Sequence, residues 1–157
     1  MNSLLAVLVA LTIAPASHRL GSYSEIMSAL QAGEDVRIVV DYSKTILEVD
    51  GEKEESPKAI GGTKIDSWEW FDKGVVRNEL AYFATSHTVM IAHPRYGHVN
   101  NYVRFRVYSD GQVEITARYL SLDKNEILMD ETFRGKVSDG KDQNGVSFFI
   151  PSKNLEK

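Results

Sequence analysis

Three of the four histidines lie close together in the sequence and are the first candidates for chemistry. His87, His93 and His98 surround a loop that contains proline and glycine, and imidazole is the commonest metal ligand in proteins. On one extended strand His87 and His93 would share a face but stand about 20 Å apart, at about 3.3 Å per residue. His93 and His98 could approach across the loop, with Asp66 or Glu79 as a further ligand. Partly exposed or packed imidazoles explain the pattern more simply, so the sequence predicts no metal and no other cofactor.

A nucleophile paired with a base is the second chemistry to consider. Ser86 is adjacent to His87, but neighbouring residues on a strand point to opposite faces, so the two cannot form a hydrolase dyad. The Gly-x-Ser-x-Gly motif is absent. No catalytic residue is predicted, and a hydrolytic or metal-dependent enzyme around the three histidines is kept only as an alternative. His87 itself is a candidate ligand-binding residue, because Ser86, His87 and Thr88 form a polar patch in an otherwise apolar segment.

Two tryptophans could form a stacking platform. Trp68 and Trp70 are two residues apart, which places them on one face of a strand. Core packing on a half-buried sheet is the more usual role of such a pair. A binding surface for sugars or apolar ligands is the alternative.

An arginine stripe is the remaining candidate site. Arg104 and Arg106, with Tyr102 and Arg118, would lie on the outer face of a hairpin. Glu114 offsets their charge, so a solvated surface is the simplest interpretation. An acidic small molecule or an acidic partner could still bind there.

The elements that must position these residues begin with one helix. Ser22 followed by Glu25 is a capping box, and Ile26, Met27 and Leu30 form an apolar face. A glycine at position 33 supplies the stop, so we expect a helix over about 23–32.

The rest of the chain reads as strands and turns. The segment 52–62 is polar and rich in turn residues, and we expect a surface loop there that ends in a Gly61-Gly62 turn. Alternation and β-branched residues predict strands over 36–40, 45–49, 65–71, 75–85, 88–92, 127–133 and 146–150.

One hairpin, over 102–119, allows its register to be derived. A two-residue loop at Asp110-Gly111 would pair apolar with polar residues. A loop over 109–111 instead pairs Val107 with Val113 and Phe105 with Ile115, with Gly111 in the left-handed conformation that this loop requires. The predicted fold is α+β and predominantly antiparallel β: an N-terminal helix packed on seven to nine strands in a meander sheet, a sandwich or a partly closed barrel.

Composition excludes several classes of protein. The 157 residues carry 18 basic and 22 acidic side chains, a net charge of −4 that argues against nucleic acid as a partner. There is no cysteine, which removes thiol catalysis and thiolate metal sites.

The N-terminus predicts export. An apolar run over 4–13 leads into Ala14-Pro15-Ala16, the small-x-small pattern of a secretory signal peptide. The run is shorter than the roughly 20 residues that span a bilayer. We therefore expect a signal peptide over 1–16 and a single domain over 17–157. No later stretch predicts a membrane anchor, and the expected location is extracellular, or periplasmic if the source is bacterial.

The order of the motifs resembles the VirK-like proteins. The matching stretches are the helix that ends in Ala-Gly, Val39-Val40-Asp41-Tyr42-Ser43-Lys44, Gly61-Gly62, Phe83-Ala84-Thr85-Ser86-His87-Thr88, 102–107 with Asp110-Gly111, Thr132-Phe133, and Gly145-Val146-Ser147-Phe148-Phe149. The resemblance implies secretion and a compact domain, and it indicates no particular activity.

The resemblance also has one departure. VirK-like sequences typically carry a cysteine just after the Asp-x-Ser-Lys stretch and another near the strand that contains Thr132. Here Thr45 stands at the first place and Arg134 or Gly135 at the second. The joint absence implies the loss of a dispensable disulfide rather than of a catalytic thiol.

Together these observations predict a secreted, non-enzymatic domain that binds an unknown protein or small molecule. A barrel-like carrier is the alternative, with an apolar ligand held among Trp68, Trp70, Phe83 and Phe105.

Overall fold

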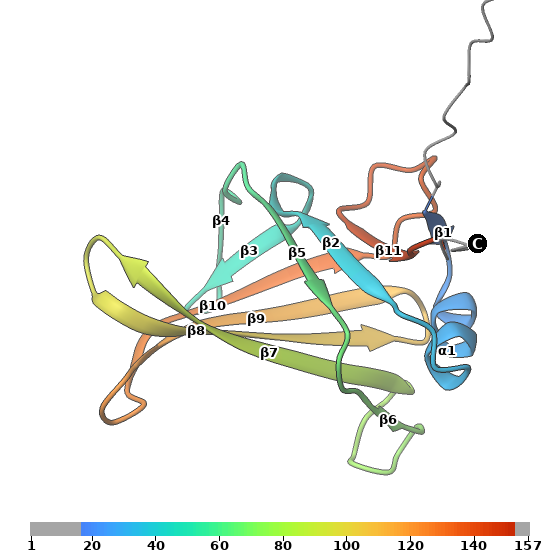
Figure 1. Ribbon diagram of the computed structural model, residues 1–157, viewed down its shortest axis with the longest axis horizontal. Coiled ribbons are helices and arrows are strands. Elements are labelled where there is room, and N and C mark those ends of the chain that lie inside the picture. Colours follow the sequence, from blue (N-terminus) through green and yellow to red (C-terminus); the bar gives the residue numbers. More distant parts are fainter. Residues whose placement is uncertain (1–16, 153–157) are drawn as a thin grey trace, which may run out of the picture.

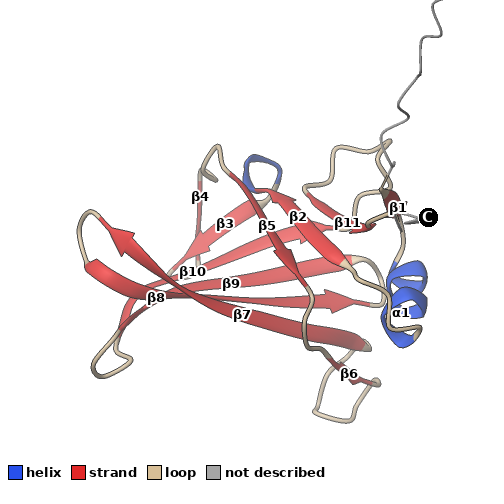
Figure 2. Cartoon of the chain, in the orientation of Figure 1, coloured by secondary structure: helices blue, strands red, loops and turns tan. Residues whose placement is uncertain are grey.

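The computed structural model describes residues 17–152, which form one α-helix, a short 3-10 turn and two antiparallel sheets (Figures 1 and 2). The smaller sheet, sheet A, has the order β1 (His18–Leu20), β11 (Val146–Ile150), β2 (Arg37–Asp41) and β5 (Ile60–Lys64). The larger sheet, sheet B, has the order β4 (Glu52–Glu54), β3 (Ile46–Val49), β10 (Ile127–Lys136), β9 (Gln112–Ser121), β8 (Gly97–Tyr108), β7 (Tyr82–His93) and β6 (Glu69–Phe71).

The predicted α+β class with mostly antiparallel strands is confirmed, in the form of an open sandwich rather than a closed barrel. Strands β6 to β10 form the expected meander. The two sheets hold four and seven strands, more than the seven to nine predicted. The additional strands are short ones, such as β1 and β4, whose three residues each give almost no alternation to detect.

The N-terminal helix α1 (Tyr23–Gln31) forms where its capping residues predict it. The Ser22 hydroxyl accepts a hydrogen bond from the Glu25 backbone N–H at 3.3 Å, while the Glu25 carboxylate accepts one from the Gly21 N–H at 2.7 Å. The buried face of α1 packs at one end of the two sheets (Figure 1), where the Tyr23 ring lies 6.2 Å from that of Phe83. No helix in the described part of the chain is long and apolar enough to cross a membrane.

The core lies between the two sheets. Phe83 of β7 and Phe148 of β11 are both fully buried, and their rings meet across the sandwich at 6.4 Å in an edge-on arrangement. Each such side chain stabilises the fold by about 1.5–3 kcal/mol through its removal from water. The sandwich is therefore tightly packed at the end that α1 closes.

The hairpin of β8 and β9 has the predicted register. Val107 pairs with Val113 and Phe105 with Ile115, and the turn residue Gly111 has φ +83°. The inner face of this hairpin, which faces sheet A, is buried. The outer face carries the arginines.

The structure differs from the sequence prediction in the middle of the chain. Gly61 and Gly62 lie in strand β5 rather than in a turn, while residues 65–68 form the crossing from sheet A to sheet B rather than a strand. The Tyr42 ring packs over Gly61, where an added Cβ would lie 3.1 Å from the ring. Gly61 serves this tertiary contact, which local patterns do not reveal.

The predicted strand over 75–85 is also misplaced. Residues 72–81 form a loop in which Asn78 Nδ2 donates to the carbonyls of Asp72 and Leu80, and Arg77 has φ +62°. The strand β7 instead runs without a break from Tyr82 to His93 and includes the polar patch around His87.

The two sheets differ greatly in strand length. Strands β7 and β8 have 12 residues each, whereas β2, β5 and β11 have 5 each. At about 3.3 Å per residue, sheet B extends well beyond sheet A. In Figure 1 the far ends of the β7–β8 and β9–β10 hairpins reach away from α1, past the strands of sheet A. Part of the inner face of sheet B is consequently left uncovered.

Candidate functional site

The five predicted binding residues lie on two different faces of sheet B and at its edge. His87 is on the inner face of β7, opposite Val103. Arg104 and Arg106 are on the outer face of β8, because the alternate residues of that strand are buried. Trp68 lies in the crossing loop and packs against the core, and Trp70 in β6 is 47% exposed. The five residues therefore do not form one site.

The outer face is an ion-paired ladder for most of its arginines. Arg106 Nη1 lies 3.4 Å from Glu114 Oε1, and Arg134 Nη1 lies 3.0 Å from the other oxygen of the same carboxylate. Arg118 pairs with Asp130 at 2.9 Å. Positive and negative side chains alternate across neighbouring strands, which agrees with the expectation that Glu114 offsets the charge of the arginine stripe.

The three clustered histidines are not brought together. His93 lies at the far end of β7, where its ring is 4.9 Å from Tyr96 and 5.0 Å from Tyr119. His98 is paired with Ala92 and so faces the opposite side of the sheet from His93. In residues 17–152 no three His, Asp or Glu side chains are placed to hold a metal ion. The metal-dependent alternative finds no ligand set in this part of the chain.

A cleft of about 220 Å³ opens between the two sheets beside His87. Its walls are β2 and β5 on one side and β7 and β8 on the other. The lining residues are Ile38, Val40, Tyr42, Gly61, Gly62, Thr63, His87, Val89, Asn101, Val103 and Phe105. The aliphatic floor is buried, while the polar groups and Val89 stand at the mouth.

Burial falls from the end of sheet B nearest α1 to the rows beside the cleft, although Val99, farther along β8, is 0% exposed. The row of paired residues nearest α1 is 0–2% exposed and consists of Phe83, Val107 and Val113. The row through His87 is half-buried apart from Val103, and consists of His87, Val103, Ala117 and Glu131. The next row is half-buried or exposed and consists of Val89, Asn101, Tyr119 and Met129. The cleft lies where the cover of sheet A ends.

The titratable groups of this region favour their uncharged forms. Burial lowers the pKa of His87, whose ring is stacked on Phe105 at 6.4 Å. Burial raises the pKa of Tyr42, with a further contribution from Tyr119. Burial also raises the pKa of Glu131, and the nearby charge of Glu54 adds to the effect. Such a surface suits a neutral, partly apolar ligand better than an ion.

Sequence reasoning identified His87 but missed Tyr42 and Asn101. A signal for Asn101 was present: extending the derived hairpin register outward places it on the core face, opposite Tyr119. A polar side chain on that face is a departure from the apolar pattern. Tyr42 carries no comparable signal, because its position depends on the packing of one sheet over the other.

The chain is similar to known proteins in sequence and in fold. The family model of the VirK protein matches residues 19–125, more than half of the chain. The chain belongs to the VirK family. The crystal structure of a VirK family protein from Legionella pneumophila is similar in fold, with a TM-score of 0.65 and 17% identity over 83% of this chain and 98% of that one. No curated protein matches.

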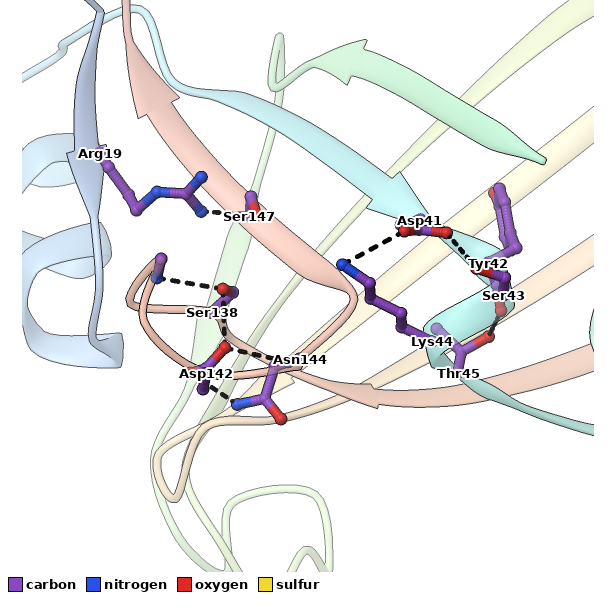
Figure 3. A network of polar contacts seen from close by, with 11 residues as sticks. Arg19, Asp41, Tyr42, Ser43, Lys44, Thr45, Ser138, Asp142, Asn144 and Ser147 are labelled. Atoms are coloured by element: carbon purple, nitrogen blue, oxygen red, sulfur yellow. Dashed lines mark hydrogen bonds and ion pairs between the residues drawn. The ribbon is translucent and has the colours of Figure 1, made fainter. Parts of the chain in front are cut away.

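The VirK-like segment of residues 41–44 forms a turn (Figure 3), and Tyr42 of this turn lines the cleft. Asp41 Oδ1 accepts from the Ser43 hydroxyl at 2.6 Å, and Lys44 Nζ lies 3.5 Å from Asp41 Oδ2. The Thr45 hydroxyl donates to the Tyr42 carbonyl at 2.8 Å. These polar residues shape a turn, and the hydrogen bond from Ser43 is the main cause of the lowered pKa of Asp41.

The loop between β10 and β11 is held by one carboxylate. Asp142 accepts hydrogen bonds from the Ser138 hydroxyl at 2.8 Å and the Asn144 N–H at 2.9 Å (Figure 3), and from the Asp139 N–H at 3.2 Å. Desolvation opposes them, yet these bonds hold the pKa of Asp142 at about 2. The loop docks on the VirK segment through Gly145, whose carbonyl accepts from the Asp41 N–H at 2.8 Å.

The two places where VirK-like sequences carry cysteine are adjacent in space. A Cβ added at Gly135 would lie 4.0 Å from the Thr45 Cβ, within the spacing of about 3.5–4.5 Å found in disulfides. Arg134, the other alignment, points to the outer face and pairs with Glu48 at 2.8 Å. Gly135 is therefore the position that faces Thr45.

Proposed function

We propose that this VirK-family protein is an exported, non-enzymatic binding domain that holds a small ligand in the cleft beside His87. The observation that carries the proposal is the cleft between the two sheets, whose aliphatic floor is buried. His87 and Asn101 of sheet B and Tyr42 of the turn after β2 contribute polar groups at its mouth. A mostly apolar cavity with a few converging polar groups is the usual form of a small-molecule site.

The chemistry of the cleft narrows the ligand. Its volume of about 220 Å³ suits a molecule the size of a single substituted ring. A larger apolar cargo is less well accommodated, because Phe83 and Phe105 are 0% and 3% exposed and belong to the packed core. The neutral forms of His87 and Tyr42 can each donate and accept a hydrogen bond, so the ligand should carry at least one hydroxyl or carbonyl group.

Export is supported by the sequence pattern of the N-terminus. The proposed signal peptide, residues 1–16, lies outside the described residues. Cleavage after Ala16 would leave intact the strand β1, in which His18 pairs with Ile150 and Leu20 with Phe148. The proposed mature protein therefore keeps every strand of both sheets.

A titration with p-cresol, a neutral ring with one hydroxyl, tests the binding site. Residues 17–157 are labelled with nitrogen-15, and we expect saturable NMR shifts centred on His87, Asn101 and Val103. Asn101→Leu should weaken binding by about three- to tenfold, the effect of one lost hydrogen bond.

The matched control is Asn100→Leu, on the same strand but on the outer face. It should leave the affinity for p-cresol unchanged. Shifts that never saturate, or equal weakening by both substitutions, would count against a ligand site in the cleft.

A further inference from the structure

A second pocket lies on the outer face of sheet B, at the corner where β6 begins and β7 continues past it. Its volume is about 440 Å³, and its lining includes Ser67, Trp68, Glu69, Ser86 and Arg104. Two of the residues that the sequence marks as binding candidates, Trp68 and Arg104, thus share one pocket. It is separate from the cleft, since His87 and Ser86 point to opposite faces of β7.

Arg104 differs from its arginine neighbours on the outer face. Arg106, Arg118 and Arg134 each pair with a carboxylate. Within residues 17–152, Arg104 has no carboxylate partner and makes one long hydrogen bond, from Nη2 to the Thr116 hydroxyl at 3.4 Å. Its Nε is buried and has no acceptor in this part of the chain. The charge of Arg104 is therefore not neutralised by a carboxylate in this part of the chain, and it can attract a bound anion.

The wall opposite Arg104 is held in place by the crossing loop. The Thr85 hydroxyl donates to the Ser67 carbonyl at 2.6 Å, and the Ile65 N–H donates to the Val36 carbonyl at 2.9 Å. Ile65 is 7% exposed and anchors the loop in the core. The backbone on both sides of Asp66 is therefore held in place, and the half-buried Trp68 follows it at the pocket.

We propose that this pocket binds the carboxylate of a small organic acid, with its flat apolar part against Trp68. The two Nη atoms of Arg104 form a planar fork that matches a carboxylate with two parallel hydrogen bonds. The hydroxyls of Ser67 and Ser86 offer further donors. Glu69 also lines the pocket, and its negative charge favours a singly charged acid over a doubly charged phosphate.

Sodium benzoate is the probe, added to the nitrogen-15 labelled protein of residues 17–157 at constant ionic strength. The Arg104 Nε–H and the Trp68 indole N–H should shift together and saturate. Benzyl alcohol, which lacks the charge, and inorganic phosphate, which lacks the ring, should each bind about tenfold more weakly. Sodium chloride at equal ionic strength should not reproduce the shifts.

Arg104→Lys tests the fork, because lysine keeps the charge but cannot form the paired hydrogen bonds. It should weaken benzoate binding about fivefold or more. Arg106→Lys, two residues along the same strand and paired with Glu114, is the control and should bind as the parent does. The proposal is overturned if Arg104→Lys binds benzoate like the parent, if phosphate or benzyl alcohol binds as tightly, or if Arg104 and Arg106 shift alike. Because p-cresol tests the cleft on the inner face and benzoate tests the pocket on the outer face, either proposal can be wrong while the other holds.

Discussion

At the scale of single residues, His87 links the cleft to pH. Burial lowers the pKa of its imidazole in the folded protein below the value of about 6.5 found in unfolded chains. Protonation therefore favours the unfolded state. The contribution of His87 to stability is complete above about pH 6.5 and is lost as the pH falls through the lowered pKa.

The substitution His87→Gln removes this titration. We expect the free energy of unfolding of the parent to fall more steeply than that of His87→Gln between about pH 7.5 and about pH 5. Urea unfolding at both values measures the difference. Glu131, whose raised pKa acts in the opposite direction at lower pH, is present in both proteins and so cancels from the comparison.

His98→Gln is the matched control, because His98 is exposed and lies on the outer face of the same sheet. It should reproduce the pH dependence of the parent. The prediction is wrong if His87→Gln and the parent lose stability in parallel.

The residues that sequence reasoning found and missed differ in how local their environment is. His87 stood out because a polar side chain in an apolar strand is visible within a few positions. The charge balance of the arginine stripe was also visible, because Glu114 pairs with Arg106 in a hairpin whose register is fixed locally. Tyr42 reaches the cleft only through the packing of sheet A over sheet B.

At the scale of elements, too, the sequence predicts what is determined locally and misses what depends on tertiary packing. Helix α1 and the β8–β9 hairpin were predictable because a cap and a three-residue turn determine them. Strand β5 was not, because Gly61-Gly62 matches a turn in isolation, whereas in the fold Gly61 makes room for the Tyr42 ring. The sequence predicts a strand over 65–71, but residues 65–68 cross from one sheet to the other. The buried Ile65 of this crossing resembles an apolar residue inside a strand.

The start of β3 and the end of β10 offer a test of how these elements are joined. The double variant Thr45→Cys with Gly135→Cys should form a disulfide under mild oxidation, because the two Cβ atoms would lie 4.0 Å apart. The bond would close a loop of about 90 residues and should raise the free energy of unfolding by about 2–4 kcal/mol. Urea unfolding of the oxidised and reduced forms measures the gain.

The single variants are the controls for the cysteine pair. A Cβ at position 135 would lie 3.0 Å from Val146 Cγ2, so Gly135→Cys alone should be slightly destabilising. Thr45→Cys alone measures the separate effect of losing the hydrogen bond from the Thr45 hydroxyl to the Tyr42 carbonyl. Thiols that remain titratable after oxidation would show that the two strands are not apposed as described.

At the scale of the whole molecule, unequal sheets explain why one fold offers two different surfaces. The strands of sheet B that outrun sheet A leave the neutral cleft on the inner face. Strand β6 begins only at Glu69, opposite Ala84, and this leaves the Arg104 pocket at the outer corner. The interior strands β10 and β11, which lie beyond the matched residues 19–125, are needed to complete both sheets.

The same scale carries the prediction of export. When the full chain is expressed in a yeast secretion host, we expect the medium to contain a protein that begins at Ser17, identified by intact mass and N-terminal sequencing. Ala16→Phe should block or shift this cleavage, because the residue before the cut must be small. Ala6→Leu, within the apolar run, should leave it unchanged.

Since β1 begins at His18 and pairs with β11, the protein cut at Ser17 should unfold cooperatively and at the same urea concentration as residues 17–157 produced directly. An intracellular product that retains Met1 would contradict export, and a secreted one that retains it would contradict cleavage.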